Sequence, residues 1–172
     1  RGYSNLWSDT RSKLSCKKNK SVLAKKSTDV LVIGAGPAGC LAAASLKKQG
    51  FSVTIVEKQK FPRFVIGESL LPKIMSNLED VGLLKAVEAV GFQKKKGAVF
   101  VEDDKFCEFD FSEKFSEGWD WTWQVKRADF DKALADEVAK QGVEVFYEHS
   151  VEHIEFFGSD SLTKILNENG EE

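Results

Sequence analysis

Three glycines, Gly34, Gly36 and Gly39, follow an apolar run at the spacing of a dinucleotide-binding turn. Gly34 lets the chain leave a strand in a tight turn, Gly36 leaves room for a pyrophosphate, and Gly39 allows a helix to pack closely on the sheet. Ala38 lies in the first turn of that helix, whose free N–H groups would face the phosphates. An ordinary Gly-rich turn is the alternative, but the flanking strand and helix patterns favour a dinucleotide site.

A carboxylate stands where such a site needs one. Glu57 ends the next apolar run, 23 residues after Gly34, close to the spacing of about 20 residues expected for the carboxylate that binds an adenosine ribose. It would repel the 2′-phosphate of NADP, so that FAD and NAD remain as candidates. The alternative for Glu57 is a solvated carboxylate at the end of a strand.

Length and composition predict a globular core. With 172 residues and 42% hydrophobic content, the chain can bury a core, and we expect one domain. Its three cysteines are scattered, so we expect neither a disulfide framework nor a metal site. They favour a reducing compartment, which we take to be the cytoplasm. No apolar run reaches the ~18 residues of a transmembrane helix.

Charge divides the chain into two segments. Residues 1–27 contain eight Lys or Arg and one Asp, a net charge of +7, whereas residues 28–172 contain 17 basic and 26 acidic residues, a net charge of −9. We expect residues 1–27 to form a flexible basic segment, either a remnant of an organelle-import signal or a linker. The acidic body argues against nucleic acid as a partner.

Hydrophobic periodicity predicts the elements that position these residues. Helices are expected over residues 38–49, 72–80, 83–90 and 128–141, and strands over 30–33, 51–56, 121–125, 143–147, 151–157 and 162–166. Residues 98–101 and 106–111 should form a β-hairpin with one buried face. A β-α-β start is thus followed by an antiparallel excursion. The last strands leave the sheet unfinished, which predicts the N-terminal piece of a longer protein.

Two further segments carry a resemblance to a known family. Residues 61–72 (FPRFVIGESLLP) and 123–131 (WQVKRADFD) closely resemble the flavin-dependent tryptophan halogenase and aromatic monooxygenase group. Residues 142–145 (GVEV) follow the second segment, and together with the glycine turn these matches span nearly all of residues 28–157 in the family's order. The resemblance implies an α/β, Rossmann-like FAD/NAD(P)-binding fold of the p-hydroxybenzoate hydroxylase type, incomplete at the C-terminus. Residues 28–172 would be the N-terminal part of this FAD-binding domain.

The resemblance also implies FAD as the bound dinucleotide. The implied FAD-binding residues are Gly34, Gly36, Ala38, Gly39, Glu57, Arg63, Glu68, Ser69, Gln124, Arg127 and Val151. Arg63 suits this role because a guanidinium offers paired donors to phosphate oxygens, and the backbone of Val151 would meet the adenine. The alternatives are an exposed loop arginine for Arg63 and helix capping for Glu68 and Ser69. Arg127 could equally be an exposed residue beside a helix start.

One lysine would decide which flavin reaction occurs. Lys95 stands where the halogenases of this group keep the lysine that captures hypohalous acid. Burial there would lower its pKa and leave the amine nucleophilic. The alternative is that Lys94, Lys95 and Lys96 form a solvated charged face. Residues 121–126 (WTWQVK) only echo the halogenase signature Trp-x-Trp-x-Ile-Pro, because the order along the chain differs and Lys126 replaces the proline. We therefore expect these tryptophans to be packing residues or cavity walls.

The reaction implied by the resemblance uses reduced flavin and O₂ to oxygenate or halogenate a small organic substrate. Electrons would come from NAD(P)H or a flavin reductase. A flavoprotein like geranylgeranyl reductase and a non-catalytic nucleotide-binding fragment stay open as alternatives. We expect this chain to be inactive by itself, because the rest of the flavin site is missing.

Overall fold

The computed structural model describes residues 26–167 and 169–170. The basic segment expected over residues 1–27 therefore lies outside the described residues, apart from Lys26 and Ser27. The helices are α1 (Pro37–Lys48), α2 (Lys73–Asp80), α3 (Leu84–Glu88) and α4 (Arg127–Lys140). The strands are β1 (Val30–Ile33), β2 (Val53–Glu57), β3 (Gln93–Lys95), β4 (Gly97–Glu102), β5 (Lys105–Asp110), β6 (Thr122–Gln124), β7 (Glu144–Tyr147), β8 (His149–Phe157) and β9 (Asp160–Asn167). Each predicted helix and strand is present, and the observed ends lie within two residues of the predicted ends.

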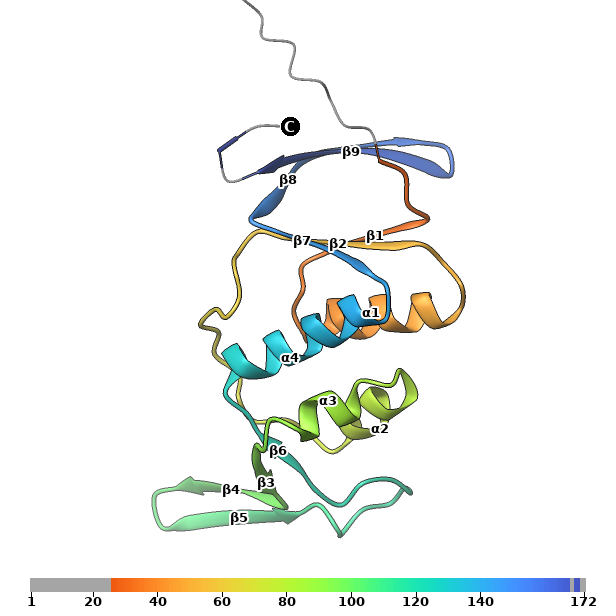
Figure 1. Ribbon diagram of the computed structural model, residues 1–172. Helices are drawn as coiled ribbons and strands as arrows, with labels where there is room; N and C mark the ends of the chain where they lie inside the picture. The colour runs from red at the N-terminus through yellow and green to blue at the C-terminus, as the bar shows by residue number, and fades with distance from the viewer. Residues whose placement is uncertain (1–25, 168, 171–172) are drawn as a thin grey trace, which may run out of the picture.

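A parallel sheet with strand order β1-β2-β7 forms the centre of the fold. Helices α1 and α4 cover one side of this sheet and the β8–β9 hairpin lies over the other (Figure 1). Every residue of the middle strand β2 is buried, because that strand has neighbours on both edges and layers on both faces. The carboxyl ends of β1 and β2 therefore meet at one edge, where Gly34 and Glu57 lie.

The hydrophobic core lies between the sheet and the helices. Its fully buried members include Cys40 and Ala43 on α1, Ile55 on β2, and Phe130 and Leu134 on α4. Small side chains on α1 let this helix approach the sheet, and the larger side chains of α4 fill the remaining space. The core fixes α1 and α4 relative to β2, so the residues at their ends are held in place.

Gly39 marks the closest approach of α1 to β1. A Cβ atom added at Gly39 would lie 2.0 Å from the carbonyl oxygen of Gly34 and 3.3 Å from Cγ1 of Val32. Because one of these atoms belongs to the backbone, the clash could be relieved only by moving the turn. The position thus requires a residue without a Cβ.

Gly39→Ala is expected to lower the free energy of unfolding by about 3 kcal/mol, because the added methyl overpacks a contact with backbone atoms. Urea unfolding followed by circular dichroism measures this loss. Gly36→Ala is the matched control, since a Cβ at Gly36 would come no closer than 3.6 Å to its neighbours. Equal losses in the two variants would contradict this account of the turn.

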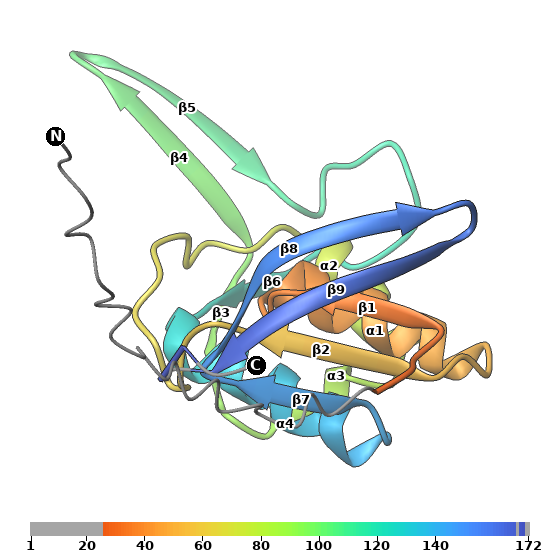
Figure 2. The same cartoon turned by 90° about the horizontal axis from the view of Figure 1, so that it is seen from above.

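The β4–β5 hairpin forms as expected, but the expectation that one of its faces is buried is wrong. Phe100, Phe106 and Phe109 are 63%, 74% and 53% exposed. The rings of Phe100 and Phe109 contact each other, with centroids 5.7 Å apart, yet the hairpin projects away from the sheet and helices (Figure 2). Alternating residues specify a strand with an apolar face, but they do not specify a layer that covers it.

Among the described residues, no helix is long and apolar enough to cross a lipid bilayer. The same part of the chain contains no cluster of three or more His, Cys, Asp or Glu side chains that could hold a metal ion.

Candidate functional site

The glycine turn leaves the N-terminus of α1 open. Gly34 has a φ of +99°, in the left-handed region that favours glycine, and its N–H donates to the carbonyl of Val56 at 2.8 Å. Gly36 is the N-cap of α1, and no side chain caps the helix there. Pro37 occupies the first turn, which also contains no acidic residue. The first N–H groups of α1 are therefore available to an anion.

Glu57 is joined to this turn by its carboxylate. It is 4% exposed, and its Oε2 accepts a hydrogen bond from the N–H of Ala35 at 2.9 Å, while its Oε1 accepts one from the N–H of Gln59 at 2.9 Å. Burial excludes the alternative of a solvated carboxylate at the end of a strand. Each oxygen keeps a second lone pair that a ribose hydroxyl could use.

Arg63 reaches the same turn from the loop after β2. Its Nη2 lies 3.6 Å from the position that a Cβ of Gly36 would occupy and 3.7 Å from Oε2 of Glu57. The guanidinium lies over the ring of Phe61, 4.8 Å from the centroid. Its side chain is only 14% exposed, which excludes the alternative of an exposed loop arginine.

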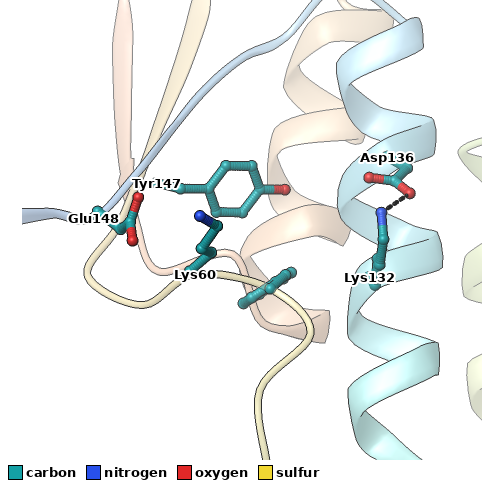
Figure 3. A pocket seen from close by; sticks show the side chains of 6 residues that line it. Lys60, Lys132, Asp136, Tyr147 and Glu148 are labelled. Atoms are coloured by element: carbon teal, nitrogen blue, oxygen red, sulfur yellow. Dashed lines mark hydrogen bonds and ion pairs between the residues drawn. The ribbon is translucent and has the colours of Figure 1, made fainter.

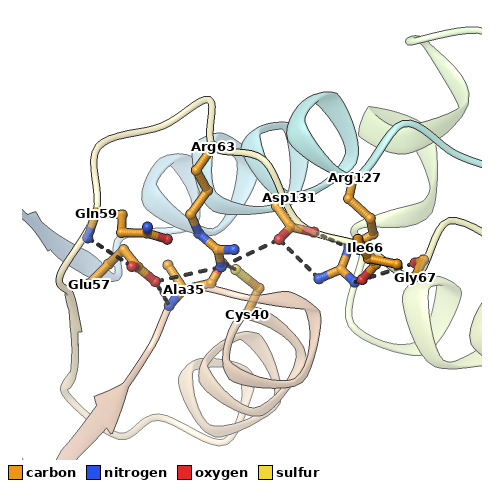
Figure 4. A network of polar contacts seen from close by, with 9 residues as sticks. All are labelled: Ala35, Cys40, Glu57, Gln59, Arg63, Ile66, Gly67, Arg127 and Asp131. Carbon is orange, nitrogen blue, oxygen red and sulfur yellow. Dashed lines mark hydrogen bonds and ion pairs between the residues drawn. The ribbon is translucent and has the colours of Figure 1, made fainter.

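A row of buried charges continues from Arg63 to α4 (Figure 4). Asp131, which is 1% exposed, lies 3.4 Å from Nη2 of Arg63. It also accepts two hydrogen bonds from Arg127, at 2.8 Å from Nε and 3.1 Å from Nη2. Arg127 Nη1 donates to the carbonyls of Ile66 and Gly67, at 3.4 and 3.3 Å. Arg127 is thus not an exposed flanking residue, since its side chain is 15% exposed.

Asp131 is a site residue that was not predicted from the sequence, although it belongs to the matching segment 123–131. The available signal was its position four residues after Arg127 in a predicted helix, which favours an ion pair on one helix face. Its contact with Arg63 had no local signal, because the two residues come from distant parts of the chain.

These features fit the diphosphate of a dinucleotide. Gly36 supplies a surface without a side chain, and Arg63 stands at its edge. The Nε of Arg63 is buried and has no hydrogen-bond partner within the described part of the chain, which is a cost unless a ligand accepts from it. The open end of α1 adds further N–H donors. The donors at this turn therefore match a group of phosphate oxygens.

A second cluster forms around β6. The N–H of Leu70 donates to the carbonyl of Trp123 at 3.2 Å, and the N–H of Val125 donates to the carbonyl of Glu68 at 2.8 Å, so that Ser69 pairs with Gln124. The N-cap of α2 is Pro72 without a side-chain hydrogen bond, so neither Glu68 nor Ser69 caps that helix. The structure therefore brings Glu68, Ser69 and Gln124 together.

Lys95 joins this second cluster from the other edge of β6. It pairs with Thr122 through β3, and its Nζ donates to Oγ of Ser69 and, at 3.3 Å, to the carbonyl of Leu70. The ammonium also lies 5.2 Å from the ring centroid of Phe111. Lys95 is half-buried whereas Lys94 and Lys96 are exposed. The solvated face predicted as the alternative thus describes the two neighbours and not Lys95.

A groove of about 630 Å³ opens beside Lys95 and Ser69. Aromatic side chains from β4, β5 and the following loop line it, among them Phe100, Phe109, Phe111 and Trp119. Beside this apolar wall, the groove is lined by the ammonium groups of Lys73, Lys95 and Lys114 and by the carboxylates of Asp110, Glu113 and Glu117. The tryptophans at 119, 121 and 123 pack edge to face, with successive centroids 5.2 and 5.3 Å apart, as expected for packing residues.

Val151 lies near the start of β8, a strand that contacts β2. It pairs with Ile165, and a register shift follows between Val151 and His153. Its role toward an adenine stays a prediction.

A smaller cavity of about 240 Å³ lies beside the end of β7 (Figure 3). It is lined by Lys60, Phe61, Lys132, Asp136, Tyr147 and Glu148. Burial, with a smaller effect of the Asp136 carboxylate, raises the pKa of Tyr147 to about 12, so this phenol stays protonated at neutral pH. None of the predicted site residues lines this cavity.

Cys40 is buried behind the glycine turn, with its Sγ donating to the carbonyl of Ala35 at 3.3 Å. Burial, and next the carboxylate of Asp131, raises the pKa of its thiol to about 12. Because only the thiolate reacts with alkylating agents, we expect iodoacetamide at neutral pH to modify the exposed Cys107 of the folded protein and to leave Cys40 unmodified.

Peptide mapping by mass spectrometry measures both thiols, and unfolding in urea is the control that should make Cys40 reactive. Rapid alkylation of Cys40 in the folded protein would contradict the burial of this position.

The fold and the site define a class of protein. The family model of the FAD-binding domain matches residues 27–171. The chain therefore belongs to this family, and FAD is the cofactor of its site. The expected α/β fold of the p-hydroxybenzoate hydroxylase type is confirmed.

Particular relatives narrow the class. The chain is 43% identical over 132 residues to tryptophan 2-halogenase of Chondromyces crocatus, covering 77% of this chain and 25% of that protein. A flavoprotein/dehydrogenase of Cytophaga hutchinsonii is 62% identical with a TM-score of 0.80, covering 83% of this chain and 35% of that one. The chondrochloren halogenase of a myxobacterium is 30% identical with a TM-score of 0.76, covering 85% and 34%. The predicted resemblance to flavin-dependent halogenases is confirmed, and the chain spans about a quarter of the curated relative's length.

Proposed function

We propose that the protein containing this chain is an FAD-dependent halogenase. The observation that carries this proposal is Lys95, which is half-buried between Ser69 and an aromatic groove. An ammonium group has three N–H donors, and Ser69 and Leu70 accept from Lys95. A further donor is left that can point to a small oxidant beside the groove.

The residues of the first cluster would hold FAD. The glycine turn and Arg63 would bind the diphosphate, Glu57 the adenosine ribose, and Val151 the adenine. The segment with Glu68 and Ser69, together with Gln124 on β6, would support the flavin end. When bound, reduced FAD supplies electrons to O₂ and so provides the oxidant that converts halide to hypohalous acid.

Lys95 would then retain the hypohalous acid and direct it to the organic substrate. Its Nζ would donate a hydrogen bond to that acid while Ser69 and Leu70 hold the amine in place. The groove lined by Phe100, Phe109 and Phe111 would bind the substrate and exclude water from it. NAD(P)H, directly or through a flavin reductase, is the proposed source of electrons.

Two other functions stay as candidates. Oxygenation of the substrate needs the same cofactor site but gives Lys95 no role, and reduction of a prenyl chain by a reduced flavin would need no O₂. The location of the protein is also a proposal: Cys40 and Cys107 are free thiols, which suits a reducing compartment such as the cytoplasm.

The test uses the full-length protein with FAD, a flavin reductase, NADH, O₂ and bromide or chloride. A panel of phenols and indoles serves as the probe, and mass spectrometry identifies the products. The proposal predicts halogenated products that depend on both halide and O₂. Hydroxylated products without halogenation would support the monooxygenase alternative and overturn the halogenase proposal, as would reduction of a prenyl substrate without O₂.

A further inference from the structure

One buried carboxylate links two arginines that come from different segments. Asp131 on α4 lies 3.4 Å from Arg63 and binds Arg127 through two hydrogen bonds. Arg63 belongs to the loop after β2, whereas Arg127 starts α4 and also holds the carbonyls of Ile66 and Gly67. The carboxylate of Asp131 is therefore a buried partner that Arg63 and Arg127 share.

The charges in this row balance without any ligand. Glu57, Arg63, Asp131 and Arg127 alternate in sign, and Glu57 and Asp131 are almost completely buried. Two carboxylates flank Arg63, so its positive charge is already partly offset. The affinity of the site for a diphosphate must then depend on the orientation of the guanidinium as much as on its charge.

Asp131 determines that orientation. It contacts the Nη2 end of Arg63, which is also the atom nearest to Gly36, and the buried Nε is left without a partner in the described residues. Without Asp131, Glu57 would be the nearest carboxylate and would draw the guanidinium toward the ribose position. The Arg63 side chain would then no longer be held at the edge of the glycine turn.

We propose that Asp131 is a positioning residue for the diphosphate of FAD, which holds the Arg63 guanidinium at Gly36 and, through Arg127, fastens the loop at residues 66–67 to α4. This inference rests on the proposed placement of FAD at the glycine turn. Asp131 acts through Arg63 and does not touch the cofactor.

The test is a double-mutant cycle on the full-length apoprotein, with the FAD dissociation constant measured by quenching of flavin fluorescence. Asp131→Asn is expected to weaken FAD binding about tenfold in the wild-type background, because Arg63 loses the buried ion-pair partner that orients it. In the Arg63→Ala background, the same substitution should change the constant by less than about twofold, because the group that Asp131 positions is gone.

Asp136→Asn is the matched control. Asp136 lies on the same helix and pairs with Lys132, but it is exposed, so FAD affinity should not change. If Asp131→Asn does not fold, the double variant Asp131→Asn with Arg127→Gln replaces it, because this variant leaves no unpaired buried charge at the contact. It should again weaken FAD binding in the wild-type background and change it much less in the Arg63→Ala background.

Three outcomes separate the hypotheses. A loss that disappears in the Arg63→Ala background supports the proposal. An equal loss in both backgrounds assigns Asp131 a purely structural role and overturns it. Failure of the wild-type protein to bind FAD would refute the proposed FAD site and this inference together. It is distinguishable from an equal loss in both backgrounds, which refutes only the role of Asp131 in a protein that does bind FAD.

Discussion

Gly36→Ala is expected to remove FAD binding while the fold stays intact. A Cβ at Gly36 would meet only Nη2 of Arg63, at 3.6 Å, which is ordinary van der Waals contact. The added methyl would, however, occupy the surface on which the pyrophosphate must lie, between the end of α1 and the guanidinium. We expect FAD affinity to fall at least about a hundredfold, or about 2.8 kcal/mol.

The measurement is an FAD titration of the full-length apoprotein, together with urea unfolding in the absence of FAD. The free energy of unfolding should fall by less than about 1 kcal/mol, the cost of alanine at an N-cap. Wild-type FAD affinity in the Gly36→Ala protein would show that the diphosphate does not lie at this turn.

Lys95→Ala is expected to abolish halogenation without loss of FAD. Lys95 is the amine that contacts Ser69 and Leu70 at the edge of the aromatic groove, which Lys73 and Lys114 also line. Removing a group that holds the reactive oxidant should lower the halogenation rate about a hundredfold to a thousandfold, the range found for key donors in active sites.

Lys96→Ala is the matched control, because Lys96 is the exposed neighbour of Lys95. Product formation by mass spectrometry and FAD content by absorbance are measured for both variants. Unchanged halogenation by Lys95→Ala would rule out the lysine mechanism, whereas loss of FAD in this variant would instead assign Lys95 to the cofactor site.

The sequence predicted the glycine turn and Glu57 well because their signals are local. A strand, a turn and a helix impose the spacing of Gly34, Gly36 and Gly39, and the next strand ends at the carboxylate. The boundaries of most helices followed from apolar periodicity for the same reason. Arg63 and Ser69 were placed through resemblance, and the structure shows which side chains they meet.

Contacts between distant segments could not be predicted in this way. Asp131 meets Arg63 only because α4 packs on the sheet beside the loop after β2, and no local pattern encodes that meeting. For the β4–β5 hairpin, the alternation of residues predicted the two strands correctly. The prediction that one face is buried was wrong, because it assumed a further layer that would cover the aromatic side chains. Lys95 differs from its neighbours Lys94 and Lys96 because its amine contacts Ser69 and Leu70, which lie far from it in the sequence.

The central claim is that FAD binds at the turn formed by residues 34–39. The most direct test is the FAD content of the purified full-length protein, measured by its visible absorbance spectrum and by release of the flavin on denaturation. We predict a yellow protein with equimolar FAD, or a colourless one that takes up equimolar FAD on reconstitution. A colourless protein that cannot be reconstituted with FAD would contradict the account.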